Sequence, residues 1–562
     1  MPPTESLRKM TVTAITSALD DGVMRSQGAA LTAAEKRDVA AYLGIAGAAP
    51  AAAAPPCPGE TRWTAPASSP SWSGWSPGLA NWRFQNDTAS GLNAATVPRL
   101  QLAWAYAFPG ATNMHVQPAV YRGRVYVGSP DGTVVSLDAV TGCSYWTARA
   151  AAQVRTGITL ADAGGRSLAY LGDTAGFVYA FDARTGAAVW KRRLDEHQAA
   201  METATPVFHD GVLYVGVGSY EESAAARADY LCCTFRGSIS ALDAATGAPL
   251  WKTWTIPDSA RPQPENKHGK KVMGPSGAGI WAAPTIDAAA GLLYVTTGDN
   301  YSDPATDTSD AVLALSLKDG RIVWSRQLTS GDAFNSSCGA GPNCPDSSGP
   351  DFDLGSSAML TTLPSGRRVL LAGQKSGRIH ALDPDKKGEL LWSTRVGKGG
   401  ALGGIQWGPA TDGTRVYAAV SDIAFRRANT PRGFEPDPNT GGGISALRPD
   451  NGEILWSTPA PGCGDRHPCS PAQSSAISVI GGAVFSASLD GHLRAYDAAT
   501  GKIVWDFDAA REFQTVNGVK GTGGSFDCGG PVAAGGMLFT ASGYAQWGGL
   551  PGNVLLAFAP AR

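Results

Sequence analysis

A stretch of apolar residues alternating with polar ones, followed by a turn and a tryptophan, recurs along the chain after residue 100. One copy runs from Val134 to Asp138, continues through Gly142 and reaches Trp146. Period-two alternation is typical of β-strands, and glycine at the turn allows a positive φ. Each copy therefore predicts a β-hairpin whose second strand carries the tryptophan. The seven copies end at Trp146, Trp190, Trp251, Trp324, Trp392, Trp456 and Trp505.

A second strand pair precedes most copies, as in residues 118–127, which turn at Gly123. Four strands in each repeat are typical of a propeller blade. Residues 554–558 form a first hairpin strand without its tryptophan strand, whereas residues 100–104 form a tryptophan strand without a partner. Joining these two ends completes one more blade. We therefore expect an all-β fold, an eight-bladed β-propeller of four-stranded blades with a short N-terminal helical segment.

The chain before the propeller has a different pattern. Residues 1–45 read as helical, with a capping box from Thr32 to Glu35. Residues 46–60 are an Ala/Pro-rich linker, and the propeller is expected over residues 61–562. A helical segment this short cannot hold a core alone, so it docks on the propeller or is the end of a larger domain. The chain start shows no signal peptide.

Composition and charge narrow the function classes. The 562 residues carry a net charge of -2 without a basic block, which argues against a nucleic-acid partner. No apolar run is long enough to span a membrane as a helix. A ring of blades leaves a central funnel where loops converge. From the repeat alone, an enzyme and a non-catalytic scaffold of the outer-membrane assembly type both remain open.

Motifs outside the repeat add a family resemblance. The segments 81–88, 100–104 and 373–377, together with the Ala-Leu-Asp-Ala-Ala-Thr-Gly turns, closely resemble eight-bladed quinoprotein alcohol dehydrogenases, which use pyrroloquinoline quinone (PQQ). Segments 232–237 and 308–315 are most similar to the polyvinyl-alcohol dehydrogenase branch. The resemblance covers residues 80–562. It implies oxidation of a secondary alcohol substrate to a ketone, with PQQ and Ca²⁺ as cofactors and cytochrome c as electron acceptor.

The same resemblance implies a set of cofactor-binding residues. PQQ is a flat quinone with three carboxylates, so its site needs an aromatic platform and cations. Trp281 matches the family's stacking residue, and Arg155 and Lys375 match its cationic contacts. Arg236 and Thr203 match weaker contacts.

A calcium site is implied as well, because Ca²⁺ takes several oxygen ligands and the family supplies a Glu, an Asn and an Asp. Alignment on residues 236–237 favours Glu221 over its neighbour Glu222. Asp299 stands nearest the family Asn, with Asn300 beside it, and either could coordinate. Asp310 completes the expected ligand set.

The expected catalytic base is a carboxylate beside the quinone and the metal. Asp310 is the first choice and Asp307 the second, because the local alignment is ambiguous. The base takes the hydroxyl proton while hydride leaves the carbinol carbon for the quinone.

The cysteines predict an oxidising compartment, periplasmic or secreted. Cys338 with Cys344, and Cys463 with Cys469, each close a short loop that suits a disulfide better than a zinc site. Cys57 and Cys143 could form a third bridge, which leaves Cys528 odd.

The adjacent pair Cys232 and Cys233 forms either a vicinal disulfide or two buried thiols. Relatives place such a disulfide against PQQ, although elsewhere in their chains, so both cysteines are candidate cofactor contacts.

The N-terminal helices resemble the last part of a cytochrome c domain, a likeness carried by residues 22–43. No Cys-x-x-Cys-His motif exists, so this chain binds no covalent haem and electrons are expected to pass to a separate cytochrome. His115, His268 and His492 receive no role. The dehydrogenase reading requires Trp281 and the other matched residues to meet in one pocket on the ring axis.

Overall fold

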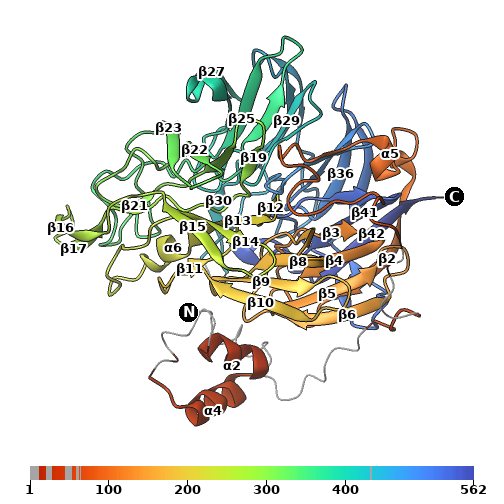
Figure 1. Cartoon of the computed structure of the whole chain (residues 1–562), viewed down its shortest axis with the longest axis horizontal. Helices are drawn as coiled ribbons and strands as arrows, with labels where there is room; N and C mark the ends of the chain where they lie inside the picture. The colour runs from red at the N-terminus through yellow and green to blue at the C-terminus, as the bar shows by residue number, and fades with distance from the viewer. Residues whose placement is uncertain are drawn as a thin grey trace.

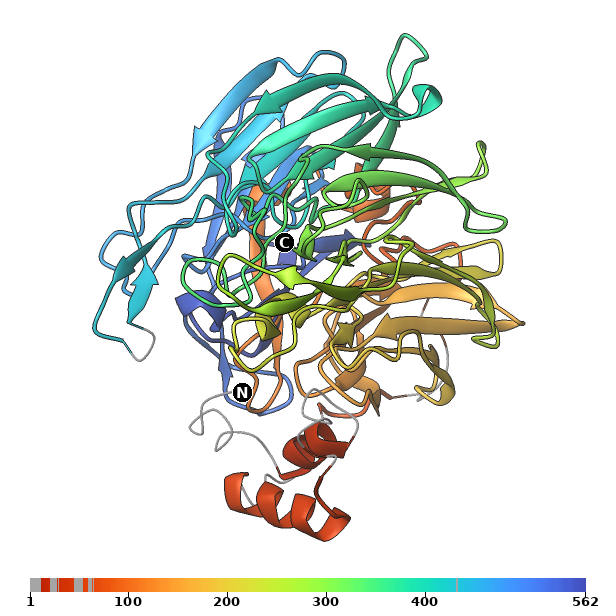
Figure 2. The same ribbon diagram turned by 90° about the vertical axis from the view of Figure 1, so that its left-hand side faces the viewer.

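Eight four-stranded antiparallel sheets form a ring within the described residues 65–430 and 433–561 of the computed structural model (Figure 1). The structure also describes residues 12–20, 28, 30–44, 54–58 and 63. Figure 2, turned by 90°, shows the blades succeeding one another in chain order. The predicted eight-bladed propeller is confirmed.

Seven blades are continuous in sequence. The first blade has β3 (Ala119–Tyr121), β4 (Arg124–Gly128), β5 (Thr133–Asp138) and β6 (Ser144–Arg149), and the second has β7 (Thr159–Ala163), β8 (Arg166–Gly172), β9 (Phe177–Asp182) and β10 (Ala188–Arg193). The third has β12 (Val207–His209), β13 (Val212–Ser219), β14 (Ser238–Asp243) and β15 (Pro249–Trp254). The fourth has β19 (Thr285–Asp287), β20 (Leu292–Thr296), β22 (Ala311–Ser316) and β23 (Ile322–Gln327). The fifth blade has β24 (Met359–Thr362), β25 (Arg368–Gln374), β26 (Arg378–Asp383) and β27 (Glu389–Arg395). The sixth has β28 (Ala410–Thr411), β29 (Val416–Val420), β32 (Gly443–Leu447) and β33 (Ile454–Pro459). The seventh has β34 (Ser478–Ile480), β35 (Ala483–Ala487), β36 (His492–Asp497) and β37 (Ile503–Asp508).

The eighth blade joins the two ends of the propeller. Strand β2 (Leu100–Ala107) pairs antiparallel with β42 (Val554–Pro560), in a register from Leu100 opposite Pro560 to Ala107 opposite Val554. The strands β40 (Val532–Ala534) and β41 (Met537–Ser542) complete the sheet. The predicted non-covalent closure of the ring is therefore confirmed.

Short elements decorate the blades. β1 (Phe84–Gln85) adds to β34 in parallel, and α5 (Asp87–Ser90) follows it. The remaining elements are β11 (Ala200–Met201), α6 (Glu221–Ala224), β16 (Arg261–Glu265), β17 (Lys271–Gly274), β18 (Ser276–Gly277), β21 (Asn300–Ser302), β30 (Phe425–Arg427), β31 (Phe434–Pro436), β38 (Glu512–Phe513), β39 (Gly521–Thr522) and the 3-10 turns η1 (Val97–Arg99), η2 (Pro384–Lys386) and η3 (Gln546–Gly548).

The repeated tryptophans connect neighbouring blades. The indole N–H of Trp146 donates to the carbonyl of Ala183 in the next blade at 3.0 Å, and Trp505 closes the circle by donating to Leu100 at 2.9 Å. Gly186 has a φ of 75°, and a Cβ added there would lie 2.7 Å from the Trp146 ring. The turn glycine is thus required twice, for its backbone conformation and for the tryptophan packed on it.

Two helices lie outside the ring (Figures 1 and 2), α2 (Val12–Asp20) and α4 (Ala33–Leu43). The capping box at Thr32 and Glu35 is confirmed by reciprocal hydrogen bonds. No helix in the described part of the chain is long and apolar enough to cross a bilayer. Within the predicted linker, residues 54–58 lie against the propeller, because Cys57 is bonded to Cys143.

Four disulfides are present among the described residues. Three are the predicted pairs, which join Cys57 to Cys143, Cys338 to Cys344 and Cys463 to Cys469. The fourth joins Cys232 to Cys233, so the alternative of two thiols was wrong. Cys528 is free and buried, as expected from the odd count.

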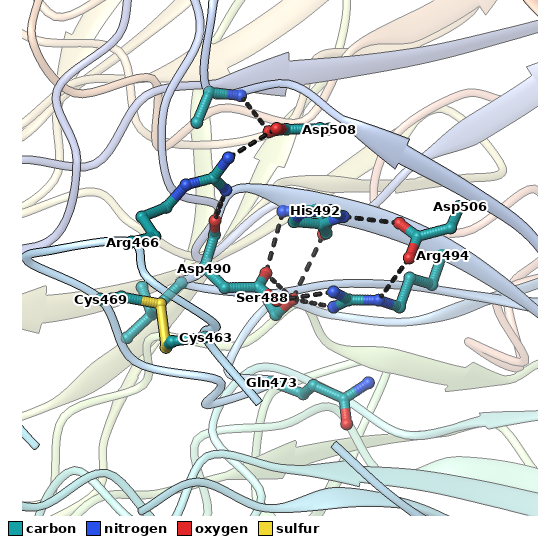
Figure 3. A network of polar contacts seen from close by, with 12 residues as sticks. Cys463, Arg466, Cys469, Gln473, Ser488, Asp490, His492, Arg494, Asp506 and Asp508 are labelled. Carbon is teal, nitrogen blue, oxygen red and sulfur yellow. Dashed lines mark hydrogen bonds and ion pairs between the residues drawn. A yellow bond between two sulfur atoms is a disulfide. The ribbon is translucent and has the colours of Figure 1, made fainter. Parts of the chain in front are cut away.

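The loop closed by Cys463 and Cys469 is held to the seventh blade by charges (Figure 3). Arg466 pairs with Asp508 at 2.5 Å and donates to the carbonyl of Asp490. The Asp490 carboxylate in turn binds Arg494 at 2.7 Å, almost fully out of solvent. This network accounts for the insertion's position.

Candidate active site

Loops from several blades meet around one cavity of about 770 Å³. Five of the residues singled out in the sequence line it: Arg155, Thr203, Trp281, Asp299 and Lys375. They lie in or beside the connections after β6, β11, β18, β20 and β25, so residues 220 positions apart in sequence are brought together by the ring. A cavity of this size is large enough for a small-molecule cofactor together with a substrate group.

Lys375 is the centre of the charged part of the cavity. Its ammonium lies 2.7 Å from Asp351 Oδ1 and 2.7 Å from Asp353 Oδ2, and its side chain is only 8% exposed. Burial alone would lower the pKa of Lys375, but Asp351, Asp353 and Glu222 outweigh burial and hold that pKa well above its usual range. Lys375 is therefore a permanent buried cation.

Three carboxylates gather beside this cation. One oxygen each from Asp299, Asp351 and Asp353 lies within 4.8 Å of the others, and Asp299 Oδ2 has no hydrogen-bond partner in the described structure. Burial raises the pKa of Asp299 well above its usual range, and the neighbouring Asp353 and Asp351 add to the shift. Converging buried carboxylate oxygens of this kind suit a hard cation such as Ca²⁺.

Trp281 forms an aromatic wall. Gly355 packs closely on it, since an added Cβ would lie 2.1 Å from the indole Cη2. Trp407 meets it edge to face at 5.0 Å between ring centroids, and the Arg155 guanidinium lies 5.0 Å from the Trp407 centroid. The Lys375 ammonium is 5.7 Å from the Trp281 centroid. A planar aromatic and two cations therefore share the cavity, as a flat polycarboxylate requires.

Of two adjacent glutamates on α6, the structure turns Glu222 to the cavity and Glu221 away from it. Glu221 accepts hydrogen bonds from the main-chain N–H of Thr234 at 3.0 Å and of Phe235 at 2.7 Å, and from the Tyr230 hydroxyl at 2.9 Å. Glu222 lines the cavity, where burial raises its pKa to about 7, Lys375 opposes the shift and Asp353 adds to it. Neighbours on a helical turn point about 100° apart, so only one can face the cavity.

Asp310 is buried next to the acidic group but is not itself among the residues that line the cavity. Its main-chain N–H donates to Gly298, a residue of the cavity wall, at 3.0 Å. Neither carboxylate oxygen of Asp310 has a hydrogen-bond partner among the described residues. Burial raises its pKa well above the usual range, with Asp353 and Asp332 adding to the shift. Asp307, by contrast, is exposed and contributes a main-chain carbonyl to Ser325.

Two more expected contacts are bonded elsewhere. The Asn300 amide donates to Ser276 at 2.9 Å and its oxygen accepts from the Thr306 N–H at 2.7 Å, so Asn300 holds a loop. Arg236 donates to the carbonyls of residues 256 and 257 and lies over Trp254, outside the cavity lining.

The disulfide of Cys232 and Cys233 is fully buried behind the cavity wall. It packs in one cluster with Phe235 and Tyr301, and of these four residues only Tyr301 lines the cavity. The disulfide therefore supports the wall from behind.

Sequence reasoning missed Asp351 and Asp353, which follow an insertion, and His115. The only signal for the two acids was their Asp-x-Asp spacing near the expected funnel. His115 lines the cavity, is 4% exposed, and neither ring nitrogen has a hydrogen-bond partner in the described structure. Both ring nitrogens of His115 can therefore hydrogen-bond a group placed in the cavity.

Comparisons with known proteins show which families and proteins this chain is similar to. The family described as "Glucose/ethanol/alcohol dehydrogenase, beta-propeller domain" matches residues 195–392, and "Outer membrane protein assembly factor BamB" matches residues 52–230 and 440–559. A polyvinylalcohol dehydrogenase of Pseudomonas sp. is 38% identical and aligns over 96% of this chain and 87% of its own length. Another, from Sphingopyxis sp., is 38% identical over 87% of this chain and 76% of its own length.

Solved structures share the fold. The quinohemoprotein alcohol dehydrogenase ADHIIG of Pseudomonas putida superposes with a TM-score of 0.66 at 19% identity, covering 87% of this chain and 80% of that one. A europium-containing methanol dehydrogenase superposes with a TM-score of 0.63 at 19% identity, covering 87% of this chain and 98% of that one.

Proposed function

Because the chain belongs to the family of PQQ-dependent alcohol dehydrogenases, to which its 38% identical polyvinylalcohol dehydrogenase relatives also belong, we propose that it oxidises secondary alcohols, polyvinyl alcohol among them, to ketones with PQQ and Ca²⁺. The observation that carries this proposal is the meeting of Trp281, Lys375 and the acidic group around Asp299 in one cavity. A scaffold has no need of such a convergence, and the alternative of an assembly scaffold is not retained.

The cavity residues fit PQQ. Trp281 offers a flat face for stacking, and Arg155 and Lys375 are cations for its carboxylates and carbonyls. Thr203 Oγ1 and both nitrogens of His115 are buried hydrogen-bonding atoms without partners in the described structure, and we assign them to the cofactor as well. When bound, PQQ supplies the hydride acceptor.

The acidic group fits Ca²⁺. We assign Asp299, Asp351, Asp353 and Glu222 as its protein ligands, with Asp310 close by. Glu222 replaces Glu221 in this assignment, because the Glu221 carboxylate is occupied by main-chain N–H groups. The ion would supply positive charge next to the quinone.

Asp310 is our proton acceptor. Its carboxylate has no partner among the described residues, and burial keeps it away from bulk water. A raised pKa makes an ionised carboxylate a stronger base, which suits removal of an alcohol proton. Asp307 is not assigned, since it is exposed.

Cytochrome c as electron acceptor and a periplasmic or secreted location belong to the same proposal. The four disulfides support an oxidising compartment. Reduction of added cytochrome c during turnover, followed by its absorbance, tests the acceptor.

Loading the purified protein with PQQ and Ca²⁺ tests the function directly. We expect PQQ to be retained after desalting, and a dye to be reduced when a secondary alcohol is added. Lys375→Met should lose PQQ retention, whereas Lys386→Met, at an exposed lysine, should behave like the wild type. Failure of the loaded wild type to retain quinone and to oxidise any secondary alcohol would contradict the proposal.

A further inference from the structure

A second cavity, of about 390 Å³, lies beside the active-site cavity. The two cavities share the wall residues Tyr220, Ala224 and Arg227, at and just beyond α6. The second cavity is within the size range of small-ligand sites. The two cavities therefore adjoin each other at α6.

The lining of this second cavity is neutral overall and mixes apolar with hydrogen-bonding groups. Arg227 and Asp229 are its only charged residues among those described, and they pair with each other at 2.7 Å. Leu231 presents an apolar side chain that is 60% exposed. Gln198 offers an exposed amide. Such a surface suits an uncharged ligand that carries both methylene and hydroxyl groups rather than an anion or a cation.

The wall between the cavities is held in place before any ligand arrives. The Tyr230 hydroxyl donates to Glu221 at 2.9 Å. The Asn343 amide donates to the carbonyls of Ala225 at 3.0 Å and Arg227 at 2.9 Å. The buried disulfide of residues 232 and 233 follows Leu231 directly. A fixed wall lowers the entropy lost on binding, so the cavity is preorganised.

We propose that the second cavity is a subsite for a linear chain of repeating methylene and carbinol groups, one carbinol of which lies in the active-site cavity. This inference rests on the proposed function and deepens it, because it makes a polymeric alcohol a better substrate than a small one. Leu231 contacts methylene groups of the bound chain, and Gln198 binds its hydroxyls.

The test compares long vinyl alcohol oligomers with a short secondary alcohol, 2-butanol. Leu231→Trp enlarges a side chain that lines the second cavity, and Gln198→Ala removes a polar contact at an exposed residue with little risk to folding. Leu250→Trp is the matched control, since Leu250 is a 55% exposed leucine on β15 that lines neither cavity. Binding of a fluorescently labelled oligomer to the apoprotein is measured by anisotropy, and kcat/KM is measured with the PQQ- and Ca²⁺-loaded enzyme.

We expect Leu231→Trp to weaken oligomer binding about tenfold, because the larger side chain takes space that the bound chain would occupy in the second cavity. Its kcat/KM for 2-butanol should stay at the wild-type value, as should both quantities in Leu250→Trp. Equal oligomer affinity in the Leu231 and Leu250 variants would overturn the subsite, and so would a parallel loss of 2-butanol oxidation. Failure of the proposed function is a different result, in which loaded wild type oxidises neither alcohol.

Discussion

The ring of docking tryptophans and the central cavity are built on the same blades, but they differ in whether their buried polar groups have hydrogen-bond partners. In the ring, the Trp146 indole has a hydrogen-bond acceptor, and positive φ falls on a glycine such as Gly186. Asp351 in the cavity wall and Asp310 behind it also have positive φ, at 59° and 48°, as do non-glycine residues of blade turns such as Asp210. The Asp310 carboxylate also lacks any partner in the described structure. The repeat thus supplies stability, whereas the site retains buried polar groups that lack partners among the described residues and that a rigid surrounding ring holds in place.

Replacing the base candidate should separate activity from stability most strongly. We expect Asp310→Asn to lower kcat by a factor of about 10² to 10⁴, the usual contribution of a general base. Stability should not fall, because asparagine tolerates positive φ and a buried, unpartnered carboxylate is removed. Kinetics of the loaded enzyme and thermal unfolding of the apoprotein measure the two effects. Asp307→Asn, at an exposed carboxylate, serves as the control, and equal activity of both variants would contradict the assignment.

Removing a docking tryptophan should lower stability and leave cofactor binding unchanged. Trp146→Ala should lower the free energy of unfolding by about 3–5 kcal/mol, the usual cost of truncating a buried aromatic residue. At a temperature where the variant is folded, PQQ retention should be unchanged because Trp146 does not line the cavity. Denaturant unfolding gives the first quantity and desalting the second. Lost PQQ retention in the folded variant would mean that the ring and the cavity are not separable.

Two glycines of similar φ separate the cost of the backbone conformation from the cost of disturbing the packed tryptophan. Gly186 and Gly211 have φ of 75° and 77°, but only Gly186 has a tryptophan ring where a Cβ would be placed. Gly211→Ala should cost about 1–2 kcal/mol for backbone conformation alone. Gly186→Ala should cost more, as measured by denaturant unfolding of both variants. Equal losses of unfolding free energy in the two variants would contradict this expectation, because the Trp146 ring would then move aside without a free-energy cost.

The smallest effect concerns pH. Glu202, next to Thr203 of the cavity, is fully buried with neither carboxylate oxygen partnered in the described structure. Burial raises its pKa well above the usual range, and Asp173 and Asp195 add to the shift. The folded state therefore holds this proton at pH values where the unfolded state has released it, so Glu202 lowers stability as pH rises above about 4.5.

Glu202→Gln should remove this contribution, and its unfolding free energy should exceed that of the wild type increasingly as pH rises. Glu196→Gln, at a carboxylate that is 88% exposed, is the control. Parallel stability profiles for the wild type and Glu202→Gln would contradict the expectation.

The blades could be predicted because each is specified locally. Alternation, a turn glycine and a tryptophan recur in every copy, so strand, turn and docking residue are all visible within a few tens of residues. Closure of the ring between β2 and β42 followed from the two incomplete copies alone. Motifs such as residues 373–377 also pointed to Lys375, which does line the cavity.

Which side chains face the cavity depended on contacts between segments far apart in sequence. Adjacent glutamates look alike in the sequence, and the main-chain N–H groups of Thr234 and Phe235 decide that Glu221 turns away and Glu222 turns inward. Asp351 and Asp353 belong to no repeat, and their place is set by the buried ammonium of Lys375. Local sequence patterns determine the strands and turns, because the hydrogen bonds that form them join residues close together in the sequence. The charge arrangement of the site is decided only by tertiary structure, because burial makes each ionised group depend on partners from other blades.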